Sequence, residues 1–191
     1  MQTKNGELFT ARCAVIASIP PWSLHKFIDG FDSNLTRAAE ATPPSDFGVF
    51  LSSYALKENM KLNYDARYGK IQINQFCQAS TAKVRELYAA LLQNKMPQHC
   101  FANGICTTIL DPTRAPNNHG TLYLYHMVPL KPEGNADNWD QLKLPFANWL
   151  REGASQFITN LDDTNILGVH HESPKDMAAY NPSFRYGDVM G

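Results

Sequence analysis

The sequence predicts an α+β fold, in which a mostly antiparallel (mixed) β-sheet carries helices packed on one face. Strand-like and helix-like segments are interspersed along the chain, and no internal repeat is present. Two strand-like segments, 100–110 and 121–129, are joined by a proline-rich turn, which favours an antiparallel hairpin. A length of 191 residues, with 43% hydrophobic and 18% charged residues, fits a folded chain with its own core.

Strands are expected where branched and aromatic residues alternate with polar ones or form short apolar runs. The first such segment is "ELFTARCAVIAS" (7–18), which alternates and then becomes continuously apolar. Pro20 and Pro21 follow it and favour an extended backbone. The full set of predicted strands is 7–18, 46–56, 68–76, 100–110, 121–129 and 164–172.

The clearest helix is predicted in 80–97, because its apolar residues recur with helical spacing. Ser80 is a candidate N-cap and Pro97 follows the end of the pattern. The apolar positions are Val84, Leu87, Tyr88, Leu91 and Leu92.

Four further helices are predicted at 22–28, 33–42, 139–158 and 173–180. Within 139–158, Pro145 is expected near a break or in a first turn. Ser173 and Pro174 have the residue types that favour the N-cap and the first helical position.

The composition excludes several classes of protein. Lys and Arg number 17 against 18 Asp and Glu, and no basic run is present, so a nucleic-acid partner is not expected. The four cysteines form no C-x-x-C pair, which indicates reduced thiols and a cytoplasmic setting. The longest apolar run, "CAVIASI", is too short to span a bilayer, so no stable membrane span is expected.

The residues also lack a self-sufficient catalytic apparatus. No two of the 11 glycines are spaced G-x-G, so neither a dinucleotide fingerprint nor a P-loop is present. The sequence "HHE" at 170–172 is not H-E-x-x-H, and adjacent histidines on a strand point to opposite faces. Neither a metal site nor a catalytic residue is therefore predicted.

Four segments in order nevertheless resemble flavin enzymes of the phytoene dehydrogenase (desaturase)-like family. The first three are "GELFTARCAVIASIPPWSLHKFI" (6–28), "KMPQHCFANGICTTILDPTRAPNNHGTLYLYHMVP" (95–129) and "DNWDQLKLPFANWL" (137–150). The fourth is "HHESPKDMAAYNPSFRYGDVMG" (170–191), which is similar to a Ser-Pro-x-Asp segment running into Gly-Asp-x-x-Gly. The two glycine-rich FAD-binding segments of that family have no counterpart in this chain.

The resemblance implies a substrate-binding domain over 22–191, preceded at 1–21 by a strand and crossover belonging to the edge of a FAD domain. FAD is then held by a FAD-binding domain of the same protein and not by this chain alone. The implied reaction is hydride transfer to or from an apolar substrate, such as an isoprenoid or polyene. Enzymes of this kind can collect substrate through an apolar helix, which adds a membrane-peripheral location as an alternative to the cytoplasmic one. The resemblance also implies that Tyr186 and Gly187 lie near the cofactor.

The strand predicted at 121–129 has two different faces. One carries Leu122, Leu124, His126 and Val128, and the other carries Thr121, Tyr123, Tyr125 and Met127. The leucine face suits packing under helices, and His126 is expected there as a core histidine. Through the resemblance, Tyr123, Tyr125 and Met127 are predicted to bind substrate, since aromatic and methionine side chains make adaptable apolar pockets. The alternative is that both faces are buried core.

The sequence is compatible with two other functions. The chain is alternatively a non-catalytic binding module for a lipid or another apolar ligand, using the same strand face. It is also compatible with an interaction or oligomerisation domain, in which exposed helix faces meet a partner.

Overall fold

The computed structural model describes residues 2–64, 73–76, 80–181 and 183–189. Within 73–76 the backbone alone is described. The chain divides into two compact units, Met1–Pro43 and Pro44–Gly191. The division therefore falls after Pro43, whereas the resemblance placed a boundary after residue 21.

The first unit contains little regular structure. A 3-10 helix spans Pro21–Lys26 and helix α1 spans Ser33–Ala41. The strand predicted within residues 1–21, at 7–18, is not formed; the prediction was wrong. A strand is stable only when neighbouring strands satisfy its backbone groups, and the described residues here offer only an isolated bridge between Gln2 and Leu8. The apolar run is instead exposed, with the Ile16 side chain 97% accessible.

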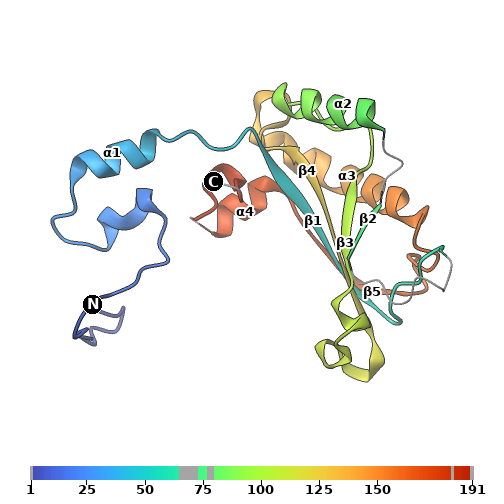
Figure 1. The fold of residues 1–191 in the computed structure, drawn as a ribbon, viewed down its shortest axis with the longest axis horizontal. Coiled ribbons are helices and arrows are strands. Elements are labelled where there is room, and N and C mark those ends of the chain that lie inside the picture. The colour runs from blue at the N-terminus through green and yellow to red at the C-terminus, as the bar shows by residue number, and fades with distance from the viewer. Residues whose placement is uncertain (1, 65–72, 77–79, 182, 190–191) are drawn as a thin grey trace. The chain divides into compact units, whose positions relative to one another are not determined.

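The second unit is built on a five-stranded sheet with the order β2-β3-β4-β1-β5, in which all neighbouring strands are antiparallel (Figure 1). The strands are β1 (Phe47–Leu56), β2 (Ile73–Phe76), β3 (Ala102–Ile105), β4 (Gly120–Pro129) and β5 (Ile166–Glu172). The predicted α+β class is thereby confirmed. Of the strand predicted at 68–76, residues 68–72 lie outside the described residues.

The predicted hairpin is also confirmed, because β3 and β4 pair antiparallel. The strand expected at 100–110 is shorter than predicted and ends at Ile105. Three short 3-10 turns follow, at Thr107–Ile109, Pro112–Arg114 and Pro116–Asn118. Proline at the first position of the last two turns favours such tight local structure over a continued strand.

Helix α3 (Trp139–Ser155) covers one face of the sheet (Figure 1). Its buried residues pack against Phe50 of β1 and Leu124 of β4, which are both completely buried. Pro145 lies inside the helix and not at a break or first turn, so that expectation was wrong. Residue 145 is on the exposed side of α3, so the proline ring and the carbonyl that it leaves without an N–H partner do not disturb the buried side of the helix.

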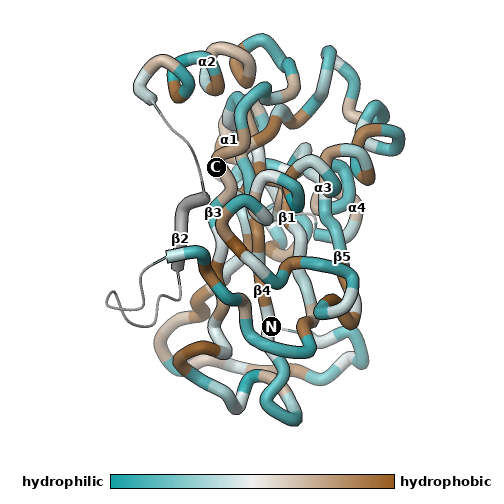
Figure 2. Tube along the Cα trace, turned by 90° about the vertical axis from the view of Figure 1, so that its right-hand side faces the viewer, coloured by the Kyte–Doolittle hydropathy of each residue, from teal (hydrophilic) through white to brown (hydrophobic). Residues whose placement is uncertain are grey.

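Helix α2 (Thr81–Leu92) begins as predicted, with the Ser80 hydroxyl accepting a hydrogen bond from the Lys83 N–H. Apolar and polar residues alternate along it, as brown and teal segments in Figure 2. Leu87 and Leu91 pack with Phe101, and this cluster contacts Phe47 and Met127. Since those last two residues point away from α3, α2 covers one end of the opposite face of the sheet.

Helix α4 (Pro174–Tyr180) also begins as predicted. Ser173 and Asp176 form a reciprocal capping box, and Pro174 takes the first helical position. Among the described residues, no helix combines the length and the apolar character needed to cross a membrane.

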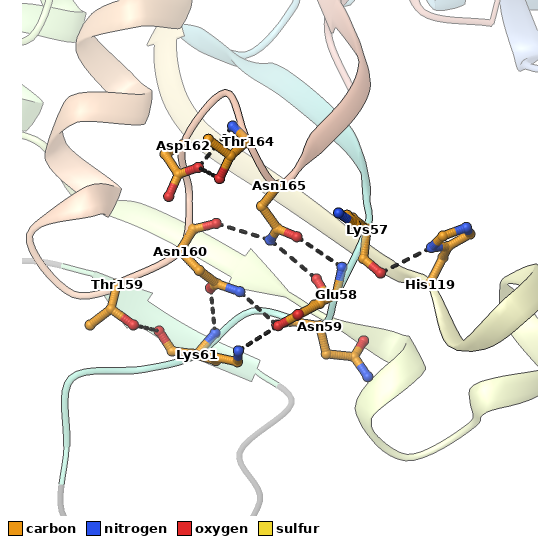
Figure 3. A network of polar contacts seen from close by, with 10 residues as sticks. All are labelled: Lys57, Glu58, Asn59, Lys61, His119, Thr159, Asn160, Asp162, Thr164 and Asn165. Carbon is orange, nitrogen blue, oxygen red and sulfur yellow. Dashed lines mark hydrogen bonds and ion pairs between the residues drawn. The ribbon is translucent and has the colours of Figure 1, made fainter.

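A polar network fixes the loop after β1 to the loop before β5 (Figure 3). The Asn165 side chain accepts a hydrogen bond from the Glu58 N–H at 2.8 Å and donates to the Asn160 carbonyl at 2.9 Å. The Asn160 amide in turn donates to the Asn59 carbonyl at 3.0 Å and accepts from the Lys61 N–H at 2.7 Å. Two asparagines therefore satisfy backbone groups that the sheet no longer pairs.

His126 is the core histidine that the sequence predicts. Its side chain is completely buried on the α3 side of β4. The Phe101 N–H donates to Nε2 at 2.9 Å, so the proton of the neutral ring is on Nδ1, which donates to the Met127 carbonyl at 2.6 Å. Burial lowers the pKa of His126 below its ordinary value.

We expect His126→Phe to destabilise the protein by about 2–3 kcal/mol, because it leaves the buried Phe101 N–H and Met127 carbonyl without partners. Stability of the wild type should fall as the pH drops below about 6.5, because the unfolded histidine binds a proton that the buried ring resists. His171, whose pKa is also lowered by burial, acts in the same direction, so the variant should lose part of this dependence. Urea unfolding between pH 7 and pH 5 measures both effects.

The exposed His170→Phe variant serves as the control for replacing a histidine by phenylalanine, and its stability at pH 7 should match that of the wild type. An unchanged pH dependence in His126→Phe would contradict the assignment of a buried neutral ring.

Candidate ligand-binding face

The two faces of β4 differ sharply in burial. Leu122, Leu124, His126 and Val128 are at most 1% exposed and lie against the α3 side. Thr121, Tyr123, Tyr125 and Met127 are half-buried on the other side. The face of β4 with the two leucines therefore packs under a helix, as expected, and the face with the two tyrosines is left partly open.

The strand pairing extends this partly open surface over the neighbouring strands. Leu51 and Ser53 of β1 stand opposite Tyr125 and Tyr123, and Asn103 and Ile105 of β3 stand opposite the same two tyrosines on the other side. Residues directly opposite in a sheet share a face. We call this surface the tyrosine face, and its members are Val49, Leu51, Ser53, Asn103, Ile105, Tyr123, Tyr125, Met127, His170 and Glu172.

The two tyrosine rings are neighbours, with centroids 6.1 Å apart and planes inclined at 49°. Burial raises the pKa of Tyr123, and the nearby carboxylate of Glu172 and the phenols of Tyr125 and Tyr180 act in the same direction. Tyr123 is therefore a neutral hydroxyl at physiological pH. The pair presents aromatic surface with two hydroxyl groups that are able to donate or accept hydrogen bonds.

Met127 lies at the α2 end of the tyrosine face. With Tyr88, Phe101 and Asn103 it lines a small, mainly apolar cavity of about 80 Å³ beneath α2. Of the three predicted substrate-binding residues, the structure thus places Tyr123 and Tyr125 on the open part and Met127 at its covered end.

The histidines of β5 point to opposite faces. His170 lies on the tyrosine face, where its Nε2 is 3.4 Å from the Glu172 carboxylate. His171 lies on the α3 side, where its Nδ1 is 2.9 Å from the Ser52 hydroxyl. Within the described ranges, no group of three or more His, Cys, Asp or Glu side chains converges on a point where a metal ion would fit.

Tyr186 and Gly187 lie apart from the tyrosine pair. The Tyr186 ring is 4.8 Å from the Lys131 ammonium, beyond the Pro129 end of β4. Tyr123 lies six residues inside that end, about 20 Å along the strand. The next residue, Asp188, accepts hydrogen bonds from the Ser45 N–H and hydroxyl and so ties this loop to the start of β1.

Sequence reasoning did not find most of the tyrosine face. The alternation of side chains in 47–54 does not show which of the two faces of this strand lies beside the tyrosines. The register with β4 shows that Val49, Leu51 and Ser53 do. The sequence places Asn103 and Glu172 in predicted strands but does not show that they share a face with the tyrosines, because the partners of a strand are fixed by the tertiary fold.

Comparison with known proteins adds no assignment. No protein-family model matches the chain, and no curated protein matches it either.

We expect Leu124→Ala to destabilise the protein by about 3 kcal/mol, as for a fully buried leucine. Tyr125→Ala, on the adjacent position, should cost only about 1 kcal/mol, because the lost contacts are those of a half-exposed cross-strand pair. Urea denaturation of the two variants measures the difference. Equal losses would mean that both faces of β4 are sealed core.

Proposed function

We propose that this chain is the substrate-binding domain of a FAD-dependent oxidoreductase similar to phytoene dehydrogenase. In this proposal the tyrosine face forms one wall of a site for an apolar substrate such as an isoprenoid or polyene. The observation that carries the proposal is the contrast across β4: one face is fully sealed under α3, while aromatic and apolar side chains remain half-open on the other.

The chemistry of the tyrosine face suits an apolar ligand that has few polar groups. Val49, Leu51 and Ile105 supply branched apolar surface around the two tyrosines. Met127 supplies an unbranched side chain that adapts to ligand shape. Hydroxyl groups of the tyrosines and the amide of Asn103 offer a small number of hydrogen-bonding positions, which is typical of binding sites for small molecules.

The described residues do not fit FAD by themselves. Gly187, which the resemblance places near the cofactor, has φ 80° and packs so closely that a Cβ atom would lie 2.1 Å from the Pro174 carbonyl oxygen. The space beside Gly187 is filled by this chain's own backbone and offers no cradle for a pyrophosphate. The proposal therefore assigns FAD to a FAD-binding domain of the same protein, and gives this chain the roles of positioning substrate and excluding water.

A second function uses the same face without a flavin: a non-catalytic binding module for a lipid or other apolar ligand. The half-open aromatic face supports it as well, since it requires no residue outside this chain. The two functions differ in whether ligand binding depends on a flavin domain.

Titration with all-trans-retinol, measured by calorimetry on the 191-residue chain and on the complete gene product, tests the tyrosine face itself in whichever of the two binds. We expect Tyr123→Ala and Tyr125→Ala each to weaken binding about five- to tenfold, because an aromatic contact contributes about 1 kcal/mol or more. Tyr64→Ala, a tyrosine that lies outside the tyrosine face, should leave binding unchanged.

Saturable binding by the chain alone favours the module, and binding that appears only when the complete gene product is used favours the oxidoreductase. The absorption spectrum of that complete protein gives a separate answer. Purification of it without a flavin band would refute the oxidoreductase proposal.

A further inference from the structure

Glu172 is the one acidic residue of the tyrosine face and lies on its edge strand, β5. Its side chain is 22% exposed, so most of it is withdrawn from water. Within the described ranges its carboxylate has a single ion-pair partner, the exposed imidazole of His170, at 3.4 Å. An ion pair with an exposed partner contributes little. The carboxylate is therefore largely desolvated without a strong partner of its own, which costs free energy.

Two other carboxylates of this unit are also withdrawn from water, and both have strong partners. Asp176 is 38% exposed and pairs with the Lys143 ammonium at 2.9 Å. Asp188 is buried and accepts hydrogen bonds from the N–H and the hydroxyl of Ser45, at 2.7 and 2.6 Å. Glu172 is less exposed than Asp176, and no lysine or arginine among the described residues pairs with it. A positively charged ligand group would supply the missing partner.

Aromatic rings lie near Glu172 on the same face of the sheet. Glu172 and Tyr125 stand in one row across the sheet, two strands apart, which corresponds to about 10 Å between their Cα atoms. The adjacent Tyr123 is within electrostatic range of the Glu172 carboxylate and of the Tyr180 phenol. Ser53, opposite Tyr123, is short and exposed, so the surface between the rings and β5 stays open. Aromatic rings beside a carboxylate are suited to binding an organic ammonium group.

The opposite end of the tyrosine face is apolar and partly enclosed. Met127 lies there beside the cavity of about 80 Å³, whose walls include Val84, Leu87 and Phe101. Glu172 and Met127 are two strands and two residues apart, which corresponds to about 12 Å between their Cα atoms. A charge at one end of the face and an apolar recess at the other fit an elongated amphiphile.

We infer that the ligand of the tyrosine face is an amphiphilic amine, an apolar chain that ends in a protonated amino group. The ammonium group lies between the Glu172 carboxylate and the rings of Tyr123 and Tyr125. The chain crosses Leu51 of β1 and ends at Met127 and the cavity under α2. This inference rests on the function proposed for the tyrosine face and names the polar group that its substrate carries.

Three ligands with the same chain and different head groups test the inference by calorimetry. They are n-decylamine, 1-decanol and decanoate, whose extended chains are of about the length between Glu172 and Met127. Both the 191-residue chain and the complete gene product are titrated. We expect decylamine to bind about tenfold more tightly than decanol, since only the amine pairs with Glu172. Decanoate should bind more weakly than decanol, because Glu172 repels it.

Three variants locate the two ends of the ligand. Glu172→Gln removes the charge and keeps the shape, so it should weaken decylamine binding about tenfold and leave decanol binding unchanged. Met127→Ala should weaken the binding of both ligands by the same factor, about two- to fivefold, because it removes apolar contacts with the chain. Glu133→Gln, an exposed residue outside the tyrosine face, is the matched control and should change neither.

Equal affinities for decylamine and decanol, or equal effects of Glu172→Gln and Glu133→Gln on decylamine binding, would overturn the inference. If all three ligands bind equally well and Tyr125→Ala weakens them alike, the tyrosine face remains an apolar site and the amine alone is refuted. Absence of binding by all three ligands, together with binding of retinol, would also refute only the amine. Absence of retinol binding as well would overturn both this inference and the proposed function.

Discussion

The rest of the structure depends on the strict alternation of side chains along β4. The side chains buried under α3 are those of Leu122, Leu124, His126 and Val128. Their burial fixes the orientation of the residues between them, which point to the opposite face of the sheet. A register shift of one residue would expose three apolar side chains and a buried hydrogen-bonded histidine. Burial of Leu122, Leu124, His126 and Val128 is therefore what directs Tyr123 and Tyr125 to the opposite side, where no helix of the described residues covers them.

His126 links this constraint to the segment that leads into β3. Its neighbours on β4 belong to the tyrosine face, while its Nε2 accepts a hydrogen bond from the Phe101 N–H, just before β3. Burying an imidazole costs the free energy of removing it from water, and the hydrogen bonds at both of its nitrogens offset that cost. In return the ring joins β4 to Phe101, which precedes the residues of β3 that pair with β4. The ring thus positions residues on two sides of the sheet.

Local signals in the sequence predicted much of this fold. Ser80, Ser173 and Pro174 mark helix starts because capping is a local hydrogen-bonding property, and the alternation in β4 is visible without knowledge of its partners. The failures are non-local. Segment 7–18 has the composition of a strand but no described partner, and Pro145 is tolerated because it falls on the exposed side of α3. The close packing of Cys100 on Gly153 of α3 could not be predicted, because tertiary structure alone brings these two residues together.

The central claim is that Tyr123 and Tyr125 face an open surface that an apolar ligand covers. Nitration of the native protein by tetranitromethane, read residue by residue by mass spectrometry, tests it directly. The structure predicts modification of Tyr123 and Tyr125 in the free chain, loss of that modification when an apolar ligand is bound, and no modification of Tyr54, which is 4% exposed on the α3 side, until the protein unfolds. Protection of Tyr123 and Tyr125 in the free chain to the same degree as Tyr54 would contradict the account.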